Sequence, residues 1–510
     1  MSASIVMEAL DMYIKEELPL QTIETGPEID PIYTRQVRTS EGVESAKVGR
    51  GWQFMHSFSS GVSGQYEPRA TTGGVPYTNA TGSVFYNSQI GFPNPAETPH
   101  VTTVTRILTL NCHHGNYSLP VWLLKPEALE SANFDQALRD FQGMVKLRAQ
   151  HEAVSFYAPS AGYLGTIAAG GGTDGSTDYS MTFTPRNSRI KWWRKGMMVD
   201  VWDTAAATGN KINENGATTD IPLVVDNVNY IDGTVTLTNW NGAFKIAGDE
   251  DNCYGGQDLD EQIGYIFPHG ASDGTTLYQT GHYGLEDWMI SDGTLFGNAT
   301  AWTQIGNDKT TAFTIANHPE FASSVTTDLN APLTDLTLNN KVGAFLDAYD
   351  GTILDTMITT QKVVNKYIEQ ASLGANRFVY DVDGKALDIV GGWRSVKYAY
   401  EGRMFDVLVS PYCQSGTLYM LKLGGGNLKR YVPPRARALD GNAPGSGMGF
   451  DGEIEFLNGL TNNGQIFSLT NSTTTGQAEP LAEAPFYQYS QVAPVDVRGI
   501  KISGITESSS

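Results

Sequence analysis

Residues 59–100 constrain the fold of this chain more than any other segment. They contain six Gly, five Pro and thirteen Ser, Thr or Asn, but only three charged residues. Loops of about 40 residues without secondary structure of their own are uncommon inside compact domains, and most of them are linkers or functional segments. A faint alternation at residues 84–90 indicates strand structure within the segment. The segment is therefore predicted to be a long two-stranded arm.

The aromatic residues of this arm need a surface to pack on. Tyr66, Tyr77, Phe85, Tyr86 and Phe92 lie in nearly neutral surroundings, whereas disordered segments are usually charged and poor in aromatic residues. The arm has too little apolar mass to bury these rings by itself. We expect it to lie across another chain and to bury the rings there.

Length, charge and cysteine usage exclude several classes of protein. At 510 residues the chain has room for about three structural units. The net charge is −21 and no basic block occurs, which argues against a protein that reads DNA sequence. Cys112, Cys253 and Cys413 lie more than a hundred residues apart, so neither a disulfide framework nor a CxxC metal site is expected. The sequence also predicts no signal peptide and no membrane span.

The apolar periodicity predicts four helices. A short amphipathic helix is expected at residues 4–18, with Tyr13 on its apolar stripe, and it is too short to be stable without docking. The strongest pattern predicts a long helix at residues 133–157, which Pro159 ends. Two further helices are predicted at residues 337–349 and 363–371.

Strand patterns fill most of the remaining chain. Aromatic residues at 52, 54 and 58 recur with period two, which is typical of a strand. Residues from 161 to about 297 are rich in short alternating runs, and Asp232-Gly233 predicts a two-residue hairpin turn among them. No internal repeat of fixed period occurs. The predicted fold class is α+β.

The sequence contains partial matches to nucleotide-binding and metal-binding motifs, but neither has the arrangement of strands and helices that such a motif needs. Gly170, Gly172 and Gly175 match GxGxxG, but no apolar strand and no helix flank them. His113 and His114 are adjacent on a predicted strand, so they would point to opposite faces and could not share a metal. We expect a protein that is not an enzyme and that holds no cofactor and no metal.

Two clusters of charged residues are candidate binding sites. The acidic stretch at residues 248–261 does not match a calcium loop, because Cys253 and Tyr254 occupy positions five and six when counting starts at Asp249. Basic residues flank Trp192 and Trp193 in a pattern that suits cation–π contacts. Three basic residues are too few for a nucleic-acid surface.

The order of the predicted elements is informative. A helix and an extended arm come first, followed by the Gly/Pro-rich loop, a long helix, a β-rich insertion and an α/β portion that ends in strands. Four regions carry the local likeness: residues 189–200 with 229–237, 281–297, 338–370 and 400–411. Over most of the chain this pattern resembles the major capsid proteins of tailed bacteriophages with the HK97 fold.

The resemblance implies a division of the chain. An HK97-like α+β capsid fold would have an N-terminal arm at residues 1–44, an extended β-hairpin E-loop at 45–110, a peripheral domain with a long spine helix at 111–165, a β-rich insertion at 166–300, an axial domain at 301–440 and a C-terminal segment at 441–510 that returns to the peripheral domain.

The resemblance also implies partners and a location. It implies a homo-oligomer of hexamers and pentamers that forms the icosahedral shell of the virion, assembles in the host cytoplasm, and encloses double-stranded DNA without sequence-specific contacts and without a membrane. Scaffolding, portal and decoration proteins are candidate partners. Some relatives cross-link a loop lysine to a neighbour. Lys47 is the only lysine between Lys15 and Lys125, and nothing around it favours that chemistry.

Nine residues of the arm regions are predicted to contact a neighbouring subunit. They are Tyr13, Trp52, Phe54, Phe58, Tyr66, Arg69, Tyr77, Phe85 and Tyr86. The alternative function is that of a carbohydrate-active phage tail protein or lyase, which the aromatic content and the Gly-rich β texture would suit. The lack of a repeat and the long helix argue against that alternative.

Overall fold

The structure is a computed structural model. It describes residues 30, 43–45, 52–60, 100–108, 111–120, 147, 150–159, 162–168, 172–174, 180–205, 207, 211, 214–215, 219–220, 223–239, 264–275, 277–278, 281–295, 301–303, 314–316, 319–349, 354–373, 396–400, 403–424, 427–432, 455–456, 468–472, 479–494 and 496–507.

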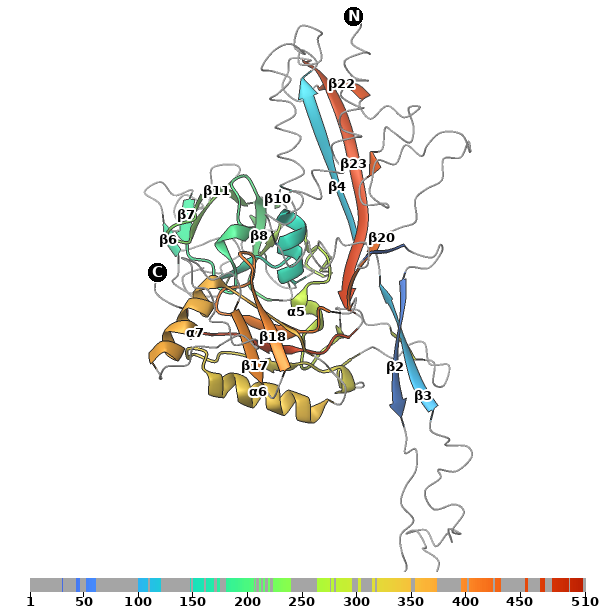
Figure 1. Cartoon of the computed structure of the whole chain (residues 1–510). Coiled ribbons are helices and arrows are strands. Elements are labelled where there is room, and N and C mark those ends of the chain that lie inside the picture. The colour runs from blue at the N-terminus through green and yellow to red at the C-terminus, as the bar shows by residue number, and fades with distance from the viewer. Residues whose placement is uncertain are drawn as a thin grey trace, which may run out of the picture.

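A mixed sheet of six strands, the body sheet, forms one half of the body. Its order is β15 (Ser324–Thr326), β24 (Ile500–Ile502), β19 (Leu418–Leu421), β16 (Thr356–Thr359), β18 (Arg403–Val409) and β17 (Val396–Tyr400). Helices α6 (Asp335–Ala348) and α7 (Gln361–Leu373) pack beside it (Figure 1). Both helices that the periodicity predicts in this region are therefore confirmed.

The start and the buried face of α6 follow from its sequence. The Thr334 side chain accepts the backbone N–H of Thr337 at 3.3 Å, which satisfies one of the free N–H groups of the first turn. Leu338, Val342 and Phe345 recur at helical spacing and are buried in the same core as strand residues of the body sheet.

A second, antiparallel sheet of seven strands lies within the predicted β-rich region. Its order is β5 (Gly165–Ile167), β13 (Gly264–Pro268), β8 (Met198–Trp202), β11 (Leu223–Asn229), β12 (Thr234–Asn239), β7 (Ser180–Phe183) and β6 (Gly172–Asp174). Val199, Val201 and Leu237 are fully buried on its inner face. The short strands β9 (Glu214–Asn215) and β10 (Thr219–Asp220) form a separate pair.

The hairpin between β11 and β12 is longer than predicted. Asn229 pairs with Thr234, so four residues form the loop and not two. The side-chain oxygen of Asn229 accepts the backbone N–H groups of Ile231 and Asp232 at 3.0 and 3.1 Å. Gly233 takes a φ of 72°, which favours glycine, and its N–H donates to the Asn229 carbonyl at 2.9 Å. The hairpin is confirmed, but Asn229 shapes a wider turn.

The end of the long predicted helix is confirmed. Residues 147 and 150–157 are helical, and the helix stops before Pro159. Its residues Phe156 and Tyr157 are fully buried, in one core with residues of the body sheet and of the seven-stranded sheet. Short helical segments complete the body: α5 (Leu285–Trp288) and the 3₁₀ turns Ile190–Trp192 and Pro319–Phe321.

Trp192 and Trp193 belong to this core. Their side chains are almost wholly buried. The indole N–H of Trp192 donates to the Tyr412 carbonyl at 2.8 Å, and that of Trp193 donates to the Ser188 hydroxyl at 3.0 Å. The bond of Trp192 thus joins this region to the body at Tyr412, whereas the bond of Trp193 is local.

Two more sheets extend out of the body. The ribbon consists of β14 (Ala301–Thr303), β3 (His100–Leu108) and β2 (Trp52–Ser60). The arm sheet has the order β1 (Val43–Ser45), β20 (Leu428–Val432), β23 (Glu479–Pro494) and β21 (Glu455–Phe456), and β22 (Ser468–Ser472) and β4 (Asn111–Pro120) also pair with β23. β4 and β23 run away from the body on one side, and β2 and β3 run away on the other (Figure 1).

Among the helices that the structure describes, none combines the length and the apolar character that a membrane span requires. The described part of the chain contains no group of three or more His, Cys, Asp or Glu side chains that could hold a metal ion.

Candidate assembly surfaces

Two strands of the ribbon, β2 and β3, lie within residues 45–110, the range predicted for the E-loop. β2 and β3 form nine antiparallel residue pairs, from Trp52 with Leu108 to Ser60 with His100. At about 3.4 Å per residue this ladder is about 30 Å long. β14 pairs with β3 at Val104, Thr105 and Arg106. The ribbon thus has three strands in its middle part and two strands toward each end.

Three of the nine predicted contact residues lie on the ribbon. Trp52, Phe54 and Phe58 are in β2, where their pairing partners are Leu108, Arg106 and Thr102. The strand predicted from their period-two spacing is confirmed, whereas their contact with a neighbour stays a prediction. Several other positions that the sequence singled out lie outside the described residues: Tyr13, Lys47, Tyr66, Arg69, Tyr77, Phe85, Tyr86, Cys253 and the acidic stretch 248–261.

The strand predicted to carry His113 and His114 is confirmed as β4, but its long partner β23 and the arm that they form together were not predicted. The two strands form ten antiparallel pairs, from Leu481 with Pro120 to Ser490 with Asn111. β23 has 16 residues, so it is about 50 Å long. Pro480 and Pro485 lie within it, and proline inside a pattern argues against a strand because it cannot donate to the ladder. These prolines explain why the local pattern does not predict β23 as a strand.

Gln491 holds the root of the arm in the body. Its side chain is fully buried at the inner end of β23. The side-chain oxygen of Gln491 accepts the backbone N–H of Tyr283 at 2.7 Å and that of Val492 at 3.1 Å. Val492 is itself part of the main core. The arm is therefore continuous with the packed interior of the body.

The region between the two large sheets contains buried titratable groups. Burial, together with the nearby Asp30 carboxylate, raises the pKa of Tyr157 well above its ordinary value. Asp30 is fully buried, so residue 30 of the predicted N-terminal arm lies within the body of its own chain. Burial also raises the pKa of Cys413, which keeps the thiol protonated and unreactive at neutral pH.

Glu286 connects α5 to two strands of the body sheet. The hydroxyl of Tyr419 donates to one carboxylate oxygen at 2.5 Å, and the ammonium of Lys501 pairs with the other. Burial, and then the Glu286 charge, raise the pKa of Tyr419, so its hydroxyl remains a donor. These two contacts hold α5 against β19 and β24.

Comparison with known proteins gives likenesses in structure only. No protein-family model and no curated protein matches this chain. Among solved structures, it is similar to the cyanophage A-1(L) capsid asymmetric unit at 12 % identity and a TM-score of 0.43, over 94 % of this chain and 93 % of that one.

Two further structures are similar to the chain. Mycobacterium phage Patience matches at 9 % identity and a TM-score of 0.32, over 98 % of this chain and 89 % of the other. The satellite phage P4 procapsid that includes size determination (Sid) protein matches at 9 % identity and a TM-score of 0.27, over 91 % and 84 %.

Proposed function

We propose that this chain is the major capsid protein of a tailed phage, with an HK97-like fold, and that its copies assemble into the icosahedral shell around double-stranded DNA. The observation that carries the proposal is the pair of strand projections on opposite sides of the body (Figure 1). The ribbon has three strands at residues 104–106 and only two at residues 57–60 and 100–103. Such narrow sheets are only marginally stable in water by themselves, so the projections gain most from lying on a neighbouring copy.

Because the ribbon and the arm project from opposite sides of the body, copies of the chain would contact each other head to tail. A chain that gives its ribbon to one neighbour can receive the ribbon of another, so the two surfaces of each contact differ. Contacts of this kind form closed rings when the rotation between neighbours closes. Hexamers and pentamers are rings of this type, and many weak repeated contacts stabilise the whole shell.

The proposal also assigns the parts of the chain. Residues 45–110 are the E-loop over the neighbour, residues 1–44 the N-terminal arm, 111–165 the peripheral domain, 166–300 the β-rich insertion, 301–440 the axial domain and 441–510 the returning segment. Trp52, Phe54 and Phe58, together with the aromatic residues of the loop, make the contact. Scaffolding, portal and decoration proteins are partners to test, and the virion capsid is the expected location.

The negative net charge of the chain is what we expect of a shell protein that does not bind DNA tightly. Tight phosphate binding needs many Lys and Arg side chains, and this chain has 34 of them against 55 acidic residues. Packaged DNA then moves along the shell wall without sequence-specific contacts.

The test compares the full-length chain with a shortened ribbon. Ser60 and His100 are a cross-strand pair, so Asn-Gly in place of residues 61–99 closes the hairpin without shifting the register. Size-exclusion chromatography and electron microscopy should show rings, tubes or closed shells for the full-length chain and single subunits for the shortened one. Circular dichroism and thermal unfolding should be the same for both, because the deletion spares every described strand.

Two results would count against the proposal. One is a full-length chain that stays monomeric at high concentration, and the other is a shortened chain that assembles as well as the full-length one. Turnover of glycans by the purified chain would favour the carbohydrate-active alternative.

A further inference from the structure

Two segments cross side by side from the body sheet to the arm sheet. One joins β19 to β20, and the other joins β23 to β24. Before the crossing, Met420 of β19 pairs with Ile500 of β24, and after it Leu428 of β20 pairs with Pro494 of β23. The pair β19–β24 in the body sheet therefore continues as the pair β20–β23 in the arm sheet. Both chain segments change sheet at the same place. We name this crossing the joint; its described residues are 422–424, 427 and 496–499.

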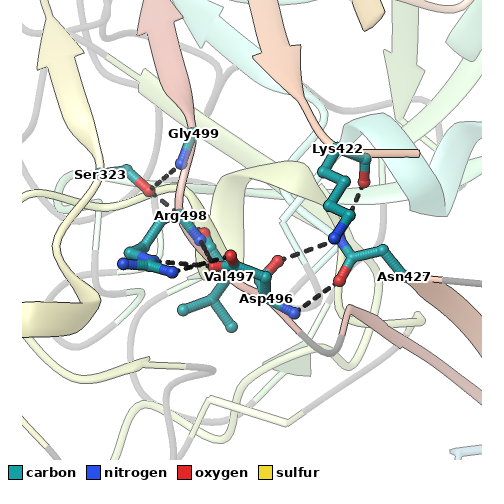
Figure 2. A network of polar contacts seen from close by, with 7 residues as sticks. All are labelled: Ser323, Lys422, Asn427, Asp496, Val497, Arg498 and Gly499. Carbon is teal, nitrogen blue, oxygen red and sulfur yellow. Dashed lines mark hydrogen bonds and ion pairs between the residues drawn. The ribbon is translucent and has the colours of Figure 1, made fainter. Parts of the chain in front are cut away.

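Asn427 ties the two crossing segments together. Its side-chain oxygen accepts the backbone N–H of Asp496 at 2.6 Å, and its amide donates to the Asp496 carbonyl at 3.2 Å and to the Lys422 carbonyl at 2.8 Å (Figure 2). Asn427 is almost wholly buried, so these bonds form out of reach of bulk water. One side chain thus satisfies three backbone groups at the place where the regular ladder is interrupted.

Asp355 holds the first crossing segment from the other side. Its carboxylate oxygens accept the backbone N–H groups of Leu423 and Gly424 at 2.8 and 2.7 Å. A Cβ on Gly424 would lie 2.7 Å from the carboxylate. The close approach aligns this segment with the start of β16, and a larger residue at position 424 would displace the Asp355 carboxylate.

The second crossing segment is held by its own side chains and by α6. The Arg498 guanidinium makes two hydrogen bonds of 2.9 Å to the Asp496 carboxylate (Figure 2). It also lies over the Tyr349 ring at the end of α6, 5.5 Å from the ring centre. Ser323 accepts the Gly499 N–H at 3.2 Å and donates to the Val497 carbonyl at 3.2 Å.

Gly499 leaves the joint no free space. A Cβ at this position would lie 2.6 Å from both the Met420 carbonyl oxygen and the terminal carbon of Met289. The crossing therefore packs against α5 and β19 as well as α6, and packed interiors of this kind switch between discrete arrangements instead of bending smoothly.

We infer that the joint sets the angle between the arm and the body, and through this angle the curvature and size of the assembled shell. β23 is about 50 Å long, so a rotation of about 5° at the joint moves the tip of the arm by about 4 Å. A shift of that size changes which contacts the arm makes with a neighbour. The link to shell size rests on the proposed capsid function, whereas the rigidity of the joint belongs to the single chain.

Asn427→Ala is the variant that tests the inference. It removes the two side-chain bonds from Asn427 to Asp496 across the joint and the bond to Lys422 within the first segment, and it leaves the core side chains in place. Asn229→Ala is the matched control, because Asn229 also bonds several groups of its own turn but lies in the β11–β12 hairpin. In particles of the full chain, Asn427→Ala should broaden or shift the distribution of diameters in electron micrographs, and Asn229→Ala should leave it unchanged. If particles of the unchanged chain, Asn427→Ala and Asn229→Ala had the same distribution of diameters, the proposed role of the joint in shell size would be wrong.

A measurement on unassembled chains keeps the two proposals separate. Spin labels at Ser118→Cys on β4 and Asn340→Cys on α6 report the distance between arm and body, in a chain with Cys112→Ser and Cys253→Ser and with the buried Cys413 retained. Asn427→Ala should make the distance distribution about two-fold broader, because three hydrogen bonds at the joint are lost. An unchanged width would overturn the inference whether or not the chain assembles, and a chain that never assembles would count only against the capsid function.

Discussion

The Lys211 ammonium lies 3.1 Å from the Asp200 carboxylate, and solvent reaches only 4 % and 1 % of the two side chains. The same carboxylate accepts the Gly270 N–H at 2.9 Å and lies 3.0 Å from Nδ1 of His269. Asp200 belongs to the central strand β8, whereas Lys211 bridges to Trp202 from a segment that follows it. This buried ion pair holds the segment around Lys211 against β8 of the seven-stranded sheet.

Removal of one partner should therefore be costly. Lys211→Met should lower the free energy of unfolding by about 3–5 kcal/mol, because it leaves a buried carboxylate without its countercharge. Urea unfolding followed by circular dichroism measures the change. Lys195→Met is the matched control, since Lys195 pairs with Asp226 at 3.3 Å but both side chains are largely exposed. The control should cost less than about 1 kcal/mol. Equal costs for the two variants would contradict this account of the buried pair.

The contact between α5 and the long helix requires a glycine. A Cβ on Gly284 would lie 2.1 Å from the Ala158 carbonyl oxygen and 2.8 Å from that of Ser155. Gly284→Ala should destabilise the fold by about 3 kcal/mol, since two backbones must move apart. Thermal unfolding measures the loss. Gly233→Asn serves as the control, because its position has open space and asparagine tolerates a φ of 72°. A large loss in the control and none in Gly284→Ala would refute the steric argument.

Alkaline pH should destabilise the fold through buried tyrosines. Burial raises the pKa of Tyr163 to about 12, and burial with the nearby Asp335 raises the pKa of Tyr398 to about 12. Their ordinary value is 10.0, so the stabilisation is complete below pH 10 and is lost as the pH rises through 12. The free energy of unfolding should fall across this window while the absorbance of tyrosinate grows. Tyr163→Phe should make the fall shallower, and an unchanged slope would speak against its part in the effect.

Mild acid should act through His151. His151 is exposed on one side, but the protein around its ring removes enough water to lower the pKa below the ordinary 6.5; Arg194 lowers it further, and Glu152 opposes the shift. A depressed pKa contributes stability above pH 6.5 that is lost as the pH falls through the folded value, because the unfolded chain binds the proton more readily. The free energy of unfolding should decline from neutral pH toward acid, and His151→Gln should remove part of the slope. Parallel curves for the two proteins would rule out His151 as the titrating group.

Local patterns of sequence predicted the local structure well. The helical spacing of Leu338, Val342 and Phe345 marks the buried face of α6, and the helix before Pro159 ends where expected. Spacing of this kind reflects one element packing on one core, which is a short-range property. The hairpin at Asp232-Gly233 was found, but its length depends on the Asn229 side chain, which bonds within the turn.

Contacts between distant residues were beyond the reach of the sequence. The joint unites Asn427 with Asp496 and Asp355 with Gly424, and these pairs are 69 residues apart. Nothing near Asn427 in the chain indicates that it caps a crossing of two strands. The arm strand β23 was missed for another reason, since its prolines argue against a strand while its partners supply the ladder from far away. Of the predicted contact residues, the three on β2 are in the expected strand.

The position of β24 has a consequence for synthesis of the protein. Residues 500–502 lie between β15 and β19, whose residues 324–326 and 418–421 leave the ribosome much earlier. Until the late strand arrives, its two neighbours each keep a row of unpaired backbone groups along one side. A translation product that stops before residue 500 cannot complete the sheet. Such a fragment would keep open strand edges that can pair with other chains, so completion of the body sheet depends on the last residues to be synthesised.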